Sequence, residues 1–462
     1  MQSFSDDELF TVWLTTMGAG DMLSRIPDSE ATPPLFYLLE WVTVHILGSG
    51  EVAVRLLPAV AGTLTVPVVY VAAATAASRR AGLASATFVA VNPFLIWYSQ
   101  EARAYAALIL LVAVSMAFLF VLARGGGGRA LAGWAIASAA ALATHYFALF
   151  LIVPEAAWLL LAAGGEVRRR AVAVAMVGVA GLLLLPLALH QRTTVSDPGG
   201  LGDSGLAERI AAIPKNFLVG FSIPAEALVT AAAAMLATFG LVLALRARED
   251  ARQTVAAAGA LAASGVLLPL TLVPLGLDYV SSRNVVAALV PAAVLLGCGF
   301  ARGRLGPPLL AGLLVLSVVT VVGVAASPEY QRRDWRGAAR ALGPARVDRV
   351  VVFSPPFRNP GPFHVYFGTE SALLHAGTRR VSEIAVIALA EGTGFGPGAP
   401  EPPRDPPPPP PPGFQMNQDI ATSTYRLVRF SSPRPRLVPR ARLAALAFPD
   451  APAVFIAETG GA

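Results

Sequence analysis

The sequence predicts an α-helical membrane protein that crosses the bilayer many times and carries a small α/β domain at its C-terminal end. Of the 462 residues, 55% are hydrophobic, and the mean hydropathy is +0.61. Only 14% of the residues are charged, whereas soluble domains carry about a quarter. Apolar runs of about 17–22 residues, each long enough to cross a bilayer core, recur through the first 326 residues.

These runs predict about ten to eleven membrane helices. A shorter apolar segment, residues 33–48, contains Glu40 and His45 and is expected to lie on the membrane surface or to re-enter it. Only Thr-His-Tyr separates two of the runs. The expected spans are 56–77, 81–98, 104–123, 130–144, 147–163, 171–190, 226–246, 255–275, 284–301 and 307–326.

The charges in the loops predict the orientation of these spans. Arginine clusters such as "SRR" at 78–80 and "RRR" at 168–170 occupy every second loop. The remaining loops, together with the acidic N-terminus, lack such clusters. Because short cytoplasmic loops carry an excess of Lys and Arg, the arginine-rich set is expected inside the cell. The other set and all residues after 326 are then extracytoplasmic.

The sequence divides into two predicted domains, residues 1–326 and residues 327–462. The second contains short strand-like segments ("DRVVVFSPP", "TYRLVRF", "APAVFIAE") and a helix-like segment at 336–343, which favour a small α/β domain. A proline-rich stretch at 397–413 interrupts it and predicts an extended linker or loop. A proline-rich peptide ligand is the less favoured interpretation of that stretch.

Composition argues against several functions. The net charge is +6 and the pI about 9.8, yet the arginines form short clusters between apolar runs, so no nucleic-acid surface is expected. Cys298 is the single cysteine, which excludes a disulfide framework and a CxxC metal site. The glycine run at 125–128 lacks the Lys and Ser/Thr of a phosphate-binding loop.

Ionisable side chains gather where the spans reach the predicted outer face. Carboxylates serve as general bases toward hydroxyl groups, and arginines hold phosphates with two hydrogen bonds. A membrane face that offers both suits a lipid phosphate that stays in the bilayer. The candidates are Asp6, Asp7, Glu8 and Glu30 near the N-terminus, then Glu101, Arg103, Tyr105, His145, Tyr146, Asp278, Tyr279 and Arg283.

Several blocks resemble one enzyme family. They are "DDELFT", "ATPPLFYLLEW", "VNPFLIWYSQEARAYA", "THYFALFL", "SSRNVVAALVP" and "RRDWRGAARAL", in this order. Together they resemble the family 39-type membrane glycosyltransferases of the GT-C superfamily, bacterial branch, which are related to protein O-mannosyltransferases and aminoarabinose transferases. The resemblance covers most of residues 6–345.

The resemblance implies a GT-C-like fold and an activity. A sugar, with mannose-like sugars among the candidates, would pass from a polyprenyl-phosphate donor to a protein, glycan or lipid acceptor, with inversion at the anomeric carbon. It implies a multi-pass protein of the bacterial plasma (inner) membrane with its active face outside. No cofactor is implied with certainty, and the resemblance leaves open whether a divalent cation is needed.

The resemblance also implies roles for individual residues. Asp7 would be the base that deprotonates or orients the acceptor hydroxyl, and Glu8 would support it or bind the acceptor. Arg103 and Arg283 would neutralise the departing lipid phosphate, in a donor-binding set that includes Glu101 and Tyr105. Glu101 would bind the sugar, position Arg103 or bind a cation. Glu30, His145 and Tyr146 are candidate substrate contacts.

Two departures from the family and several alternatives remain. The family normally has a span before the Asp-Glu pair, whereas about five residues precede it here, so a late start or an inactive truncated chain is one expectation. Thr32 stands where the family often has histidine. A transporter or flippase of lipid-linked sugars is a further alternative. Structural interpretations are a solvated acidic N-terminus, an interfacial Glu101–Arg103 ion pair, a packing role for His145 and membrane-surface anchoring by Arg283.

Overall fold

The computed structural model describes residues 2–161, 167–195, 205–246, 249–354, 365–367, 372–373, 379–389, 406–446 and 454–458. The chain forms two compact units. One consists of Leu14–Val322, and the other combines Met1–Trp13 with Gly323–Ala462. The predicted division at residues 326 and 327 remains a proposal.

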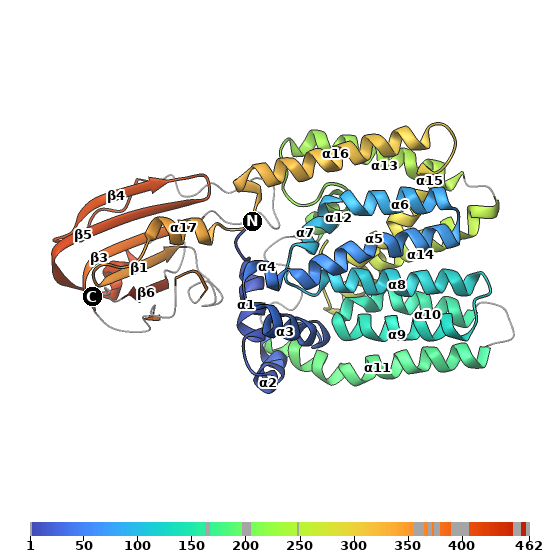
Figure 1. Ribbon diagram of the computed structural model, residues 1–462, viewed down its shortest axis with the longest axis horizontal. Helices are drawn as coiled ribbons and strands as arrows, with labels where there is room; N and C mark the ends of the chain where they lie inside the picture. Colours follow the sequence, from blue (N-terminus) through green and yellow to red (C-terminus); the bar gives the residue numbers. More distant parts are fainter. Residues whose placement is uncertain are drawn as a thin grey trace. The chain divides into compact units, whose positions relative to one another are not determined.

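The first unit is helical, and Figure 1 shows its long helices running side by side. α8 packs against both α5 and α9, and α15 packs against α6, α13 and α14. The helices are α1 (Asp6–Thr15, shared with the other unit), α2 (Ala19–Ser29), α3 (Leu35–Leu47), α4 (Glu51–Val54), α5 (Leu56–Ala76), α6 (Arg79–Val91), α7 (Pro93–Ser99), α8 (Tyr105–Ala123), α9 (Gly128–Thr144), η1 (Tyr146–Ala148), α10 (Leu149–Leu161), α11 (Val167–Thr194), α12 (Leu206–Val219), α13 (Glu226–Leu245), α14 (Glu249–Leu272), η2 (Val273–Leu275), η3 (Val286–Ala288), α15 (Leu289–Phe300) and α16 (Gly306–Ala326).

The outer surface of this unit is rich in exposed apolar side chains, which indicates that it faces lipid. Large apolar side chains are exposed along the outer helices, for example Leu183 (76%) on α11 and Leu228 (73%) on α13. Soluble proteins rarely expose contiguous apolar surface on this scale, whereas helices in a bilayer satisfy their backbone groups internally and expose apolar side chains to lipid. The predicted class, a polytopic helical membrane protein with a small C-terminal sheet domain, is confirmed.

Every predicted span coincides with helix in the described residues. Within the described part of the chain, six helices are long and apolar enough to cross a membrane, or seven if a bent pair counts as one span. The predicted number of ten to eleven membrane helices stays a prediction. Shorter apolar helices such as Leu35–Leu47 and Val286–Phe300 occupy some of the other predicted positions.

The bent pair is the predicted span 81–98, which is broken between α6 and α7 with an angle of 61°. Pro93 cannot donate a backbone hydrogen bond, and Asn92 caps α7 by accepting from the backbone N–H groups of Phe94 and Leu95 at 3.1 Å. The Asn92 amide also donates to the carbonyl oxygen of Phe217 on α12 at 2.8 Å. The break is therefore held by side-chain contacts.

The predicted surface-lying segment 33–48 forms α3. In Figure 1, α2, α3 and α4 lie at one end of the bundle of long helices. α3 buries Phe36, Tyr37 and Val44 and exposes Ile46 (73%) and Leu47 (53%). A short helix that exposes large apolar residues at the end of a membrane bundle is typical of a segment in the interfacial region.

The second unit contains a six-stranded mixed sheet with the strand order β2-β6-β1-β3-β5-β4, which Figure 1 shows with α17 packed on it. β1 and β3 are parallel, and the other pairs are antiparallel. Alternating apolar residues such as Val350, Ile384 and Phe430 form its core. The elements are η4 (Pro328–Tyr330), α17 (Trp335–Leu342), β1 (Arg349–Ser354), β2 (Ala372–Leu373), β3 (Arg379–Leu389), β4 (Gln415–Ala421), β5 (Tyr425–Val438), α19 (Arg440–Ala444) and β6 (Val454–Glu458).

The N-terminal residues complete this unit. Ser3 Oγ accepts a hydrogen bond from the backbone N–H of Arg336 at 3.1 Å, and the side chain of Gln2 accepts from Arg332 at 3.0 Å. Asp334 caps α17 by accepting from the N–H of Gly337 at 2.8 Å, and Trp335 is fully buried. The "DWR" block therefore has a structural role in the unit.

Residues 406–413 of the proline-rich stretch contain no helix or strand, while residues 397–405 lie outside the described residues. The stretch ends in a turn in which the N–H of Phe414 donates to the carbonyl oxygen of Pro411 at 2.9 Å. Phe414 enters the core of the sheet. This part of the stretch is therefore tied to the fold at its C-terminal end.

Candidate active site

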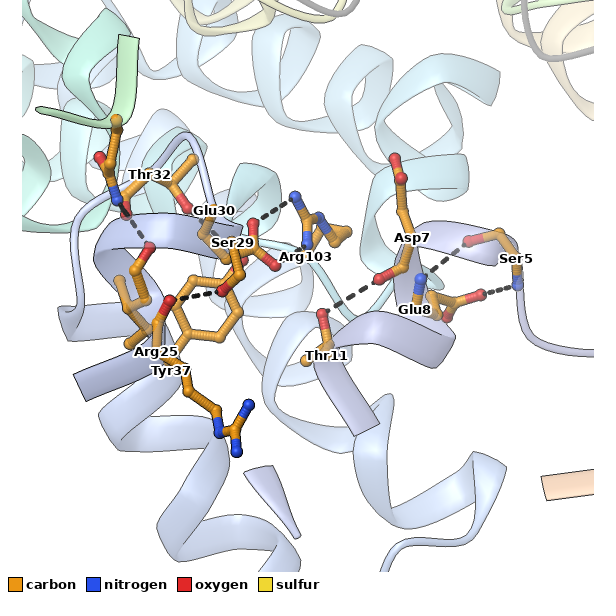
Figure 2. A network of polar contacts seen from close by, with 12 residues as sticks. Ser5, Asp7, Glu8, Thr11, Arg25, Ser29, Glu30, Thr32, Tyr37 and Arg103 are labelled. Atoms are coloured by element: carbon orange, nitrogen blue, oxygen red, sulfur yellow. Dashed lines mark hydrogen bonds and ion pairs between the residues drawn. The ribbon is translucent and has the colours of Figure 1, made fainter. Parts of the chain in front are cut away.

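An ion pair between Arg103 and Glu30 is the central feature of the polar end of the helical unit. The two terminal nitrogens of Arg103 donate to the two carboxylate oxygens of Glu30, both at 3.0 Å (Figure 2). Glu30 is the C-cap of α2, and Arg103 precedes α8. The side chains are 3% and 14% exposed, so the pair is largely removed from solvent. Such two-point geometry is the strong form of an arginine–carboxylate contact.

Tyr37 and Thr32 lie beside this pair in Figure 2. Tyr37, on α3, is fully buried, and its hydroxyl accepts a hydrogen bond from Thr32 Oγ1 at 3.4 Å. Thr32 occupies the position where the family often has histidine. In this chain it links the segment after Glu30 to α3.

Glu101 and Tyr105 flank Arg103 on the chain. Glu101 is buried, and its carboxylate accepts a hydrogen bond from the indole N–H of Trp97 on α7 at 3.0 Å. The ring of Tyr105 packs 4.7 Å from Tyr98 and 5.3 Å from His145, measured between ring centroids. The turn that connects α7 to α8 therefore presents a carboxylate, a guanidinium and an aromatic ring together.

His145 lies at the junction between α9 and η1. Burial, with the charges of Arg103 and Arg283 adding to it, lowers the pKa of His145 to about 3. Its Nδ1 accepts a hydrogen bond from the backbone N–H of Phe147 at 3.3 Å, which requires that nitrogen to be unprotonated. His145 is therefore neutral at physiological pH, with two guanidinium groups close enough to act on it.

The loop after η2 brings Arg283 to this cluster. Arg209 on α12 donates to a carboxylate oxygen of Asp278 at 2.9 Å, and these hydrogen bonds lower the pKa of Asp278. Asn216, also on α12, donates to Ser282 Oγ at 2.9 Å. α12 thus holds the loop at Asp278 and at Ser282, the residue directly before the half-buried Arg283.

A cavity of about 160 Å³ lies next to the cluster. The hydroxyl of Tyr146 donates to Gln191 Oε1 at 2.7 Å at its wall, and the ring of Phe147 packs 5.4 Å from that of Tyr279. Burial raises the pKa of Tyr146, which keeps its hydroxyl protonated. The walls are largely apolar and aromatic, with Arg192 and Gln191 as polar members.

Asp7 and Glu8 belong to the other unit, on α1. Ser5 Oγ accepts from the N–H of Glu8 at 3.3 Å, and the Glu8 carboxylate accepts from the N–H of Ser5 at 2.8 Å (Figure 2). This reciprocal pair is a capping box. Glu8 is fully buried and also forms an ion pair with Arg332 at 3.4 Å, whereas Asp7 is exposed. The structure therefore gives these neighbouring carboxylates different surroundings.

The sequence reasoning missed two polar residues that the structure identifies. Gln191 connects α11 to the segment that carries Glu30, and nothing in the local sequence indicated this contact. Glu155 lies inside α10, where it accepts hydrogen bonds from Trp134 at 2.8 Å and Ser115 at 3.2 Å. Because the Glu155 carboxylate is fully buried and hydrogen-bonded to α8 and α9, it locks the packing of these helices.

No group of three or more His, Cys, Asp or Glu with metal-binding geometry occurs among the residues that the structure describes. Glu101, for which cation binding is one of three expected roles, accepts a hydrogen bond from the Trp97 indole. A divalent cation at this site therefore remains an expectation from the resemblance.

Residues 31–190 match the model of the family described as dolichyl-phosphate-mannose-protein mannosyltransferase. Over this segment, the family resemblance is confirmed. The segment includes Arg103, Tyr105 and His145, whereas Asp7 and Arg283 lie outside it. No curated protein sequence matches this chain significantly.

Three solved structures resemble the fold. ArnT from Cupriavidus metallidurans in the apo state is 16% identical with a TM-score of 0.49, over 71% of this chain and 61% of that one. The same protein bound to undecaprenyl phosphate is 14% identical with a TM-score of 0.47, over 86% of this chain and 88% of that one. The third is the oligosaccharyltransferase AglB from Archaeoglobus fulgidus, in complex with an inhibitory peptide and a dolichol-phosphate. It is 11% identical with a TM-score of 0.44, over 73% of this chain and 54% of that one. The chain thus spans less than two thirds of the apo ArnT chain and of AglB.

Proposed function

We propose that this protein is an inverting glycosyltransferase that moves a sugar from a polyprenyl-phosphate donor to an acceptor hydroxyl on the extracytoplasmic face of the bacterial plasma membrane. The proposal is supported by the buried Arg103–Glu30 pair and by His145, whose ring lies 5.3 Å from that of Tyr105 and on which the charges of Arg103 and Arg283 act. Two guanidinium groups beside an uncharged imidazole form a site for a phosphate dianion.

The chemistry needs such a site because charge develops on the leaving group. The acceptor oxygen attacks the anomeric carbon, the bond from that carbon to the phosphate oxygen breaks, and polyprenyl phosphate leaves with the bonding electrons. Fixed cations near that oxygen stabilise the transition state more than the ground state. Arg103 and Arg283 are assigned this role, with Glu101 and Tyr105 at the donor.

Asp7 is assigned the base that takes the proton of the acceptor hydroxyl. The Asp7 side chain is exposed to solvent, and the family resemblance implies the role. Glu8 is assigned support of Asp7 through the capping box that starts α1. Glu30, His145 and Tyr146 are assigned contacts that position the donor.

The Glu30–Arg103 pair has a consequence for donor binding. The carboxylate of Glu30 engages both terminal nitrogens of Arg103, where a phosphate would bind. A donor phosphate therefore competes with Glu30 or shares the guanidinium with it. Glu30 then keeps a buried arginine charge compensated while the site is empty, which avoids the cost of an unpaired buried ion.

The test is transfer by the purified chain in nanodiscs, supplied with radiolabelled polyprenyl-phosphate sugars and an extract of candidate acceptors. We expect labelled acceptor and free polyprenyl phosphate, with both products lost in Arg103→Ala and retained in Arg129→Ala, an exposed arginine of a predicted cytoplasmic loop. Movement of intact donor across the bilayer, with no cleavage of the sugar–phosphate bond, would instead identify a flippase.

A further inference from the structure

The segment that carries Glu30 is held on both sides by one buried side chain. Gln191, at the end of α11, is 1% exposed. Its amide nitrogen donates to the carbonyl oxygen of Ile26 at 3.2 Å and to that of Thr32 at 3.1 Å. One amide therefore bridges the two ends of the short segment that contains Glu30.

Two neighbours of Gln191 hold the same segment. His190 Nε2 lies 2.7 Å from a carboxylate oxygen of Asp28, and Thr194 Oγ1 donates to the carbonyl oxygen of Pro27 at 3.2 Å. We call His190, Gln191 and Thr194 the α11 clamp. His190 and Thr194 are exposed, so water can replace their contacts. Gln191 is buried, and loss of its amide would leave two backbone carbonyl oxygens without this donor.

Gln191 also connects this segment to the cavity beside the site. Its Oε1 accepts from the Tyr146 hydroxyl at 2.7 Å, and both residues line the cavity. Tyr146 follows His145, the imidazole on which the charges of both Arg103 and Arg283 act. The hydrogen bonds of Gln191 thus join the supports of Glu30 and of His145.

We propose that Gln191 is a positioning residue that sets where the Glu30 carboxylate meets Arg103, and this rests on the proposed transferase function. The amide of Gln191 donates to the backbone of residues 26–32, so its effect on Arg103 passes through that backbone and Glu30. The physical basis is that a misplacement of about 1 Å at a charged catalytic pair can cost about 100-fold in rate.

The comparison uses the full chain in nanodiscs, with Gln191→Leu and with Gln191→Glu, which keeps an acceptor for Tyr146 but replaces the amide donors by a carboxylate that faces two carbonyl oxygens. The matched control is Gln331→Leu. Gln331 also donates with its amide nitrogen to two backbone carbonyls, those of Val324 and Ala325, but belongs to the other unit. Hydrogen exchange and transfer kinetics are measured on each variant.

We expect faster amide exchange in residues 26–33 in both Gln191 variants and unchanged exchange there in Gln331→Leu. In transfer, we expect kcat to fall about tenfold or more with the donor KM changed less than about threefold. In a double-mutant cycle, Glu30→Gln should remove most of the effect of Gln191→Leu, because both act on one pair.

The proposal is overturned if amide hydrogen exchange at residues 26–33 is unchanged in the Gln191 variants. It is also overturned if the fold-losses in kcat of Gln191→Leu and Glu30→Gln multiply in the double variant, which would show that the two residues act independently. Equal losses in Gln331→Leu and Gln191→Leu also overturn it, because they would indicate general destabilisation. If the unaltered chain transfers no sugar, the proposed function fails, and the exchange measurement still decides whether Gln191 holds the segment.

Discussion

Arg103 and Glu30 are 73 positions apart in the chain, yet each terminal nitrogen of the guanidinium lies 3.0 Å from one oxygen of the carboxylate. Both groups are mostly buried. Removing one of the two charges should therefore destabilise the helical unit more than removing both, because a buried charge without its partner lowers the free energy of unfolding.

The first prediction tests that dependence. Arg103→Gln and Glu30→Gln should each lower the free energy of unfolding by about 3–5 kcal/mol, while the double substitution should lower it by less than the sum. Reversible unfolding of the chain in mixed micelles measures this. Additive losses would show that the two side chains do not stabilise one another.

The second prediction separates the two carboxylates of α1. Asp7→Asn should leave thermal stability unchanged, since the side chain is exposed, and should abolish transfer if Asp7 is the base. Glu8→Gln should cost about 1 kcal/mol or more, because it weakens the capping box and the contact with Arg332. Thermal unfolding with Ser5→Ala as a second capping variant provides the measurement. A large stability loss in Asp7→Asn would contradict the assignment.

The third prediction concerns pH and His145. The folded pKa is about 3, below the ordinary value of 6.5, so the unfolded chain binds more protons between these values. This contribution to stability is complete above pH 6.5 and is lost as the pH falls toward 3, by at most about 1.4 kcal/mol per pH unit. Unfolding measured from pH 7 to 4.5 should show the slope, and His145→Gln should reduce it. An identical slope in the variant would refute the neutral buried imidazole.

The fourth prediction concerns the loop that carries Arg283. Arg209→Gln removes the hydrogen bonds to Asp278 and the carbonyl oxygen of Val280, so the loop should loosen. We expect a higher KM for the donor. The unaltered protein loses stability as the pH falls through the lowered pKa of Asp278, and this loss should be smaller in the variant. Donor titration of initial rates supplies the first readout. An unchanged KM would separate this loop from donor binding.

The fifth prediction tests the orientation of the helical unit. The native Cys298 is buried, so background labelling should be low. Gln100→Cys should react with an impermeant maleimide in intact spheroplasts, and Gly128→Cys should react only after permeabilisation. Both positions are exposed, and a side chain at Gly128 meets nothing within 4 Å. The reverse pattern would invert the predicted topology.

The sequence alone predicted the helical membrane class, the position of each apolar helix and the existence of a C-terminal sheet domain. These features depend on local properties: an apolar run of sufficient length, and short alternating strands such as the one that became β1. The Asn92–Pro93 pair also signals the helix break locally, although residues 81–98 are predicted as one span. Ser5 and Glu8 have capping-box spacing, although only an active-site role is predicted for Glu8.

The partners of the charged residues were decided only by the tertiary structure. Sequence proximity indicated that Glu101 lies beside Arg103, whereas the ion pair of Arg103 with Glu30 and the hydrogen bond from the Trp97 indole to Glu101 are visible only in the fold. Gln191 meets Thr32 across 159 positions. Hydropathy sets where each helix lies along the chain, but its rotation and its neighbours come from packing, and only that packing determines which buried polar groups satisfy one another.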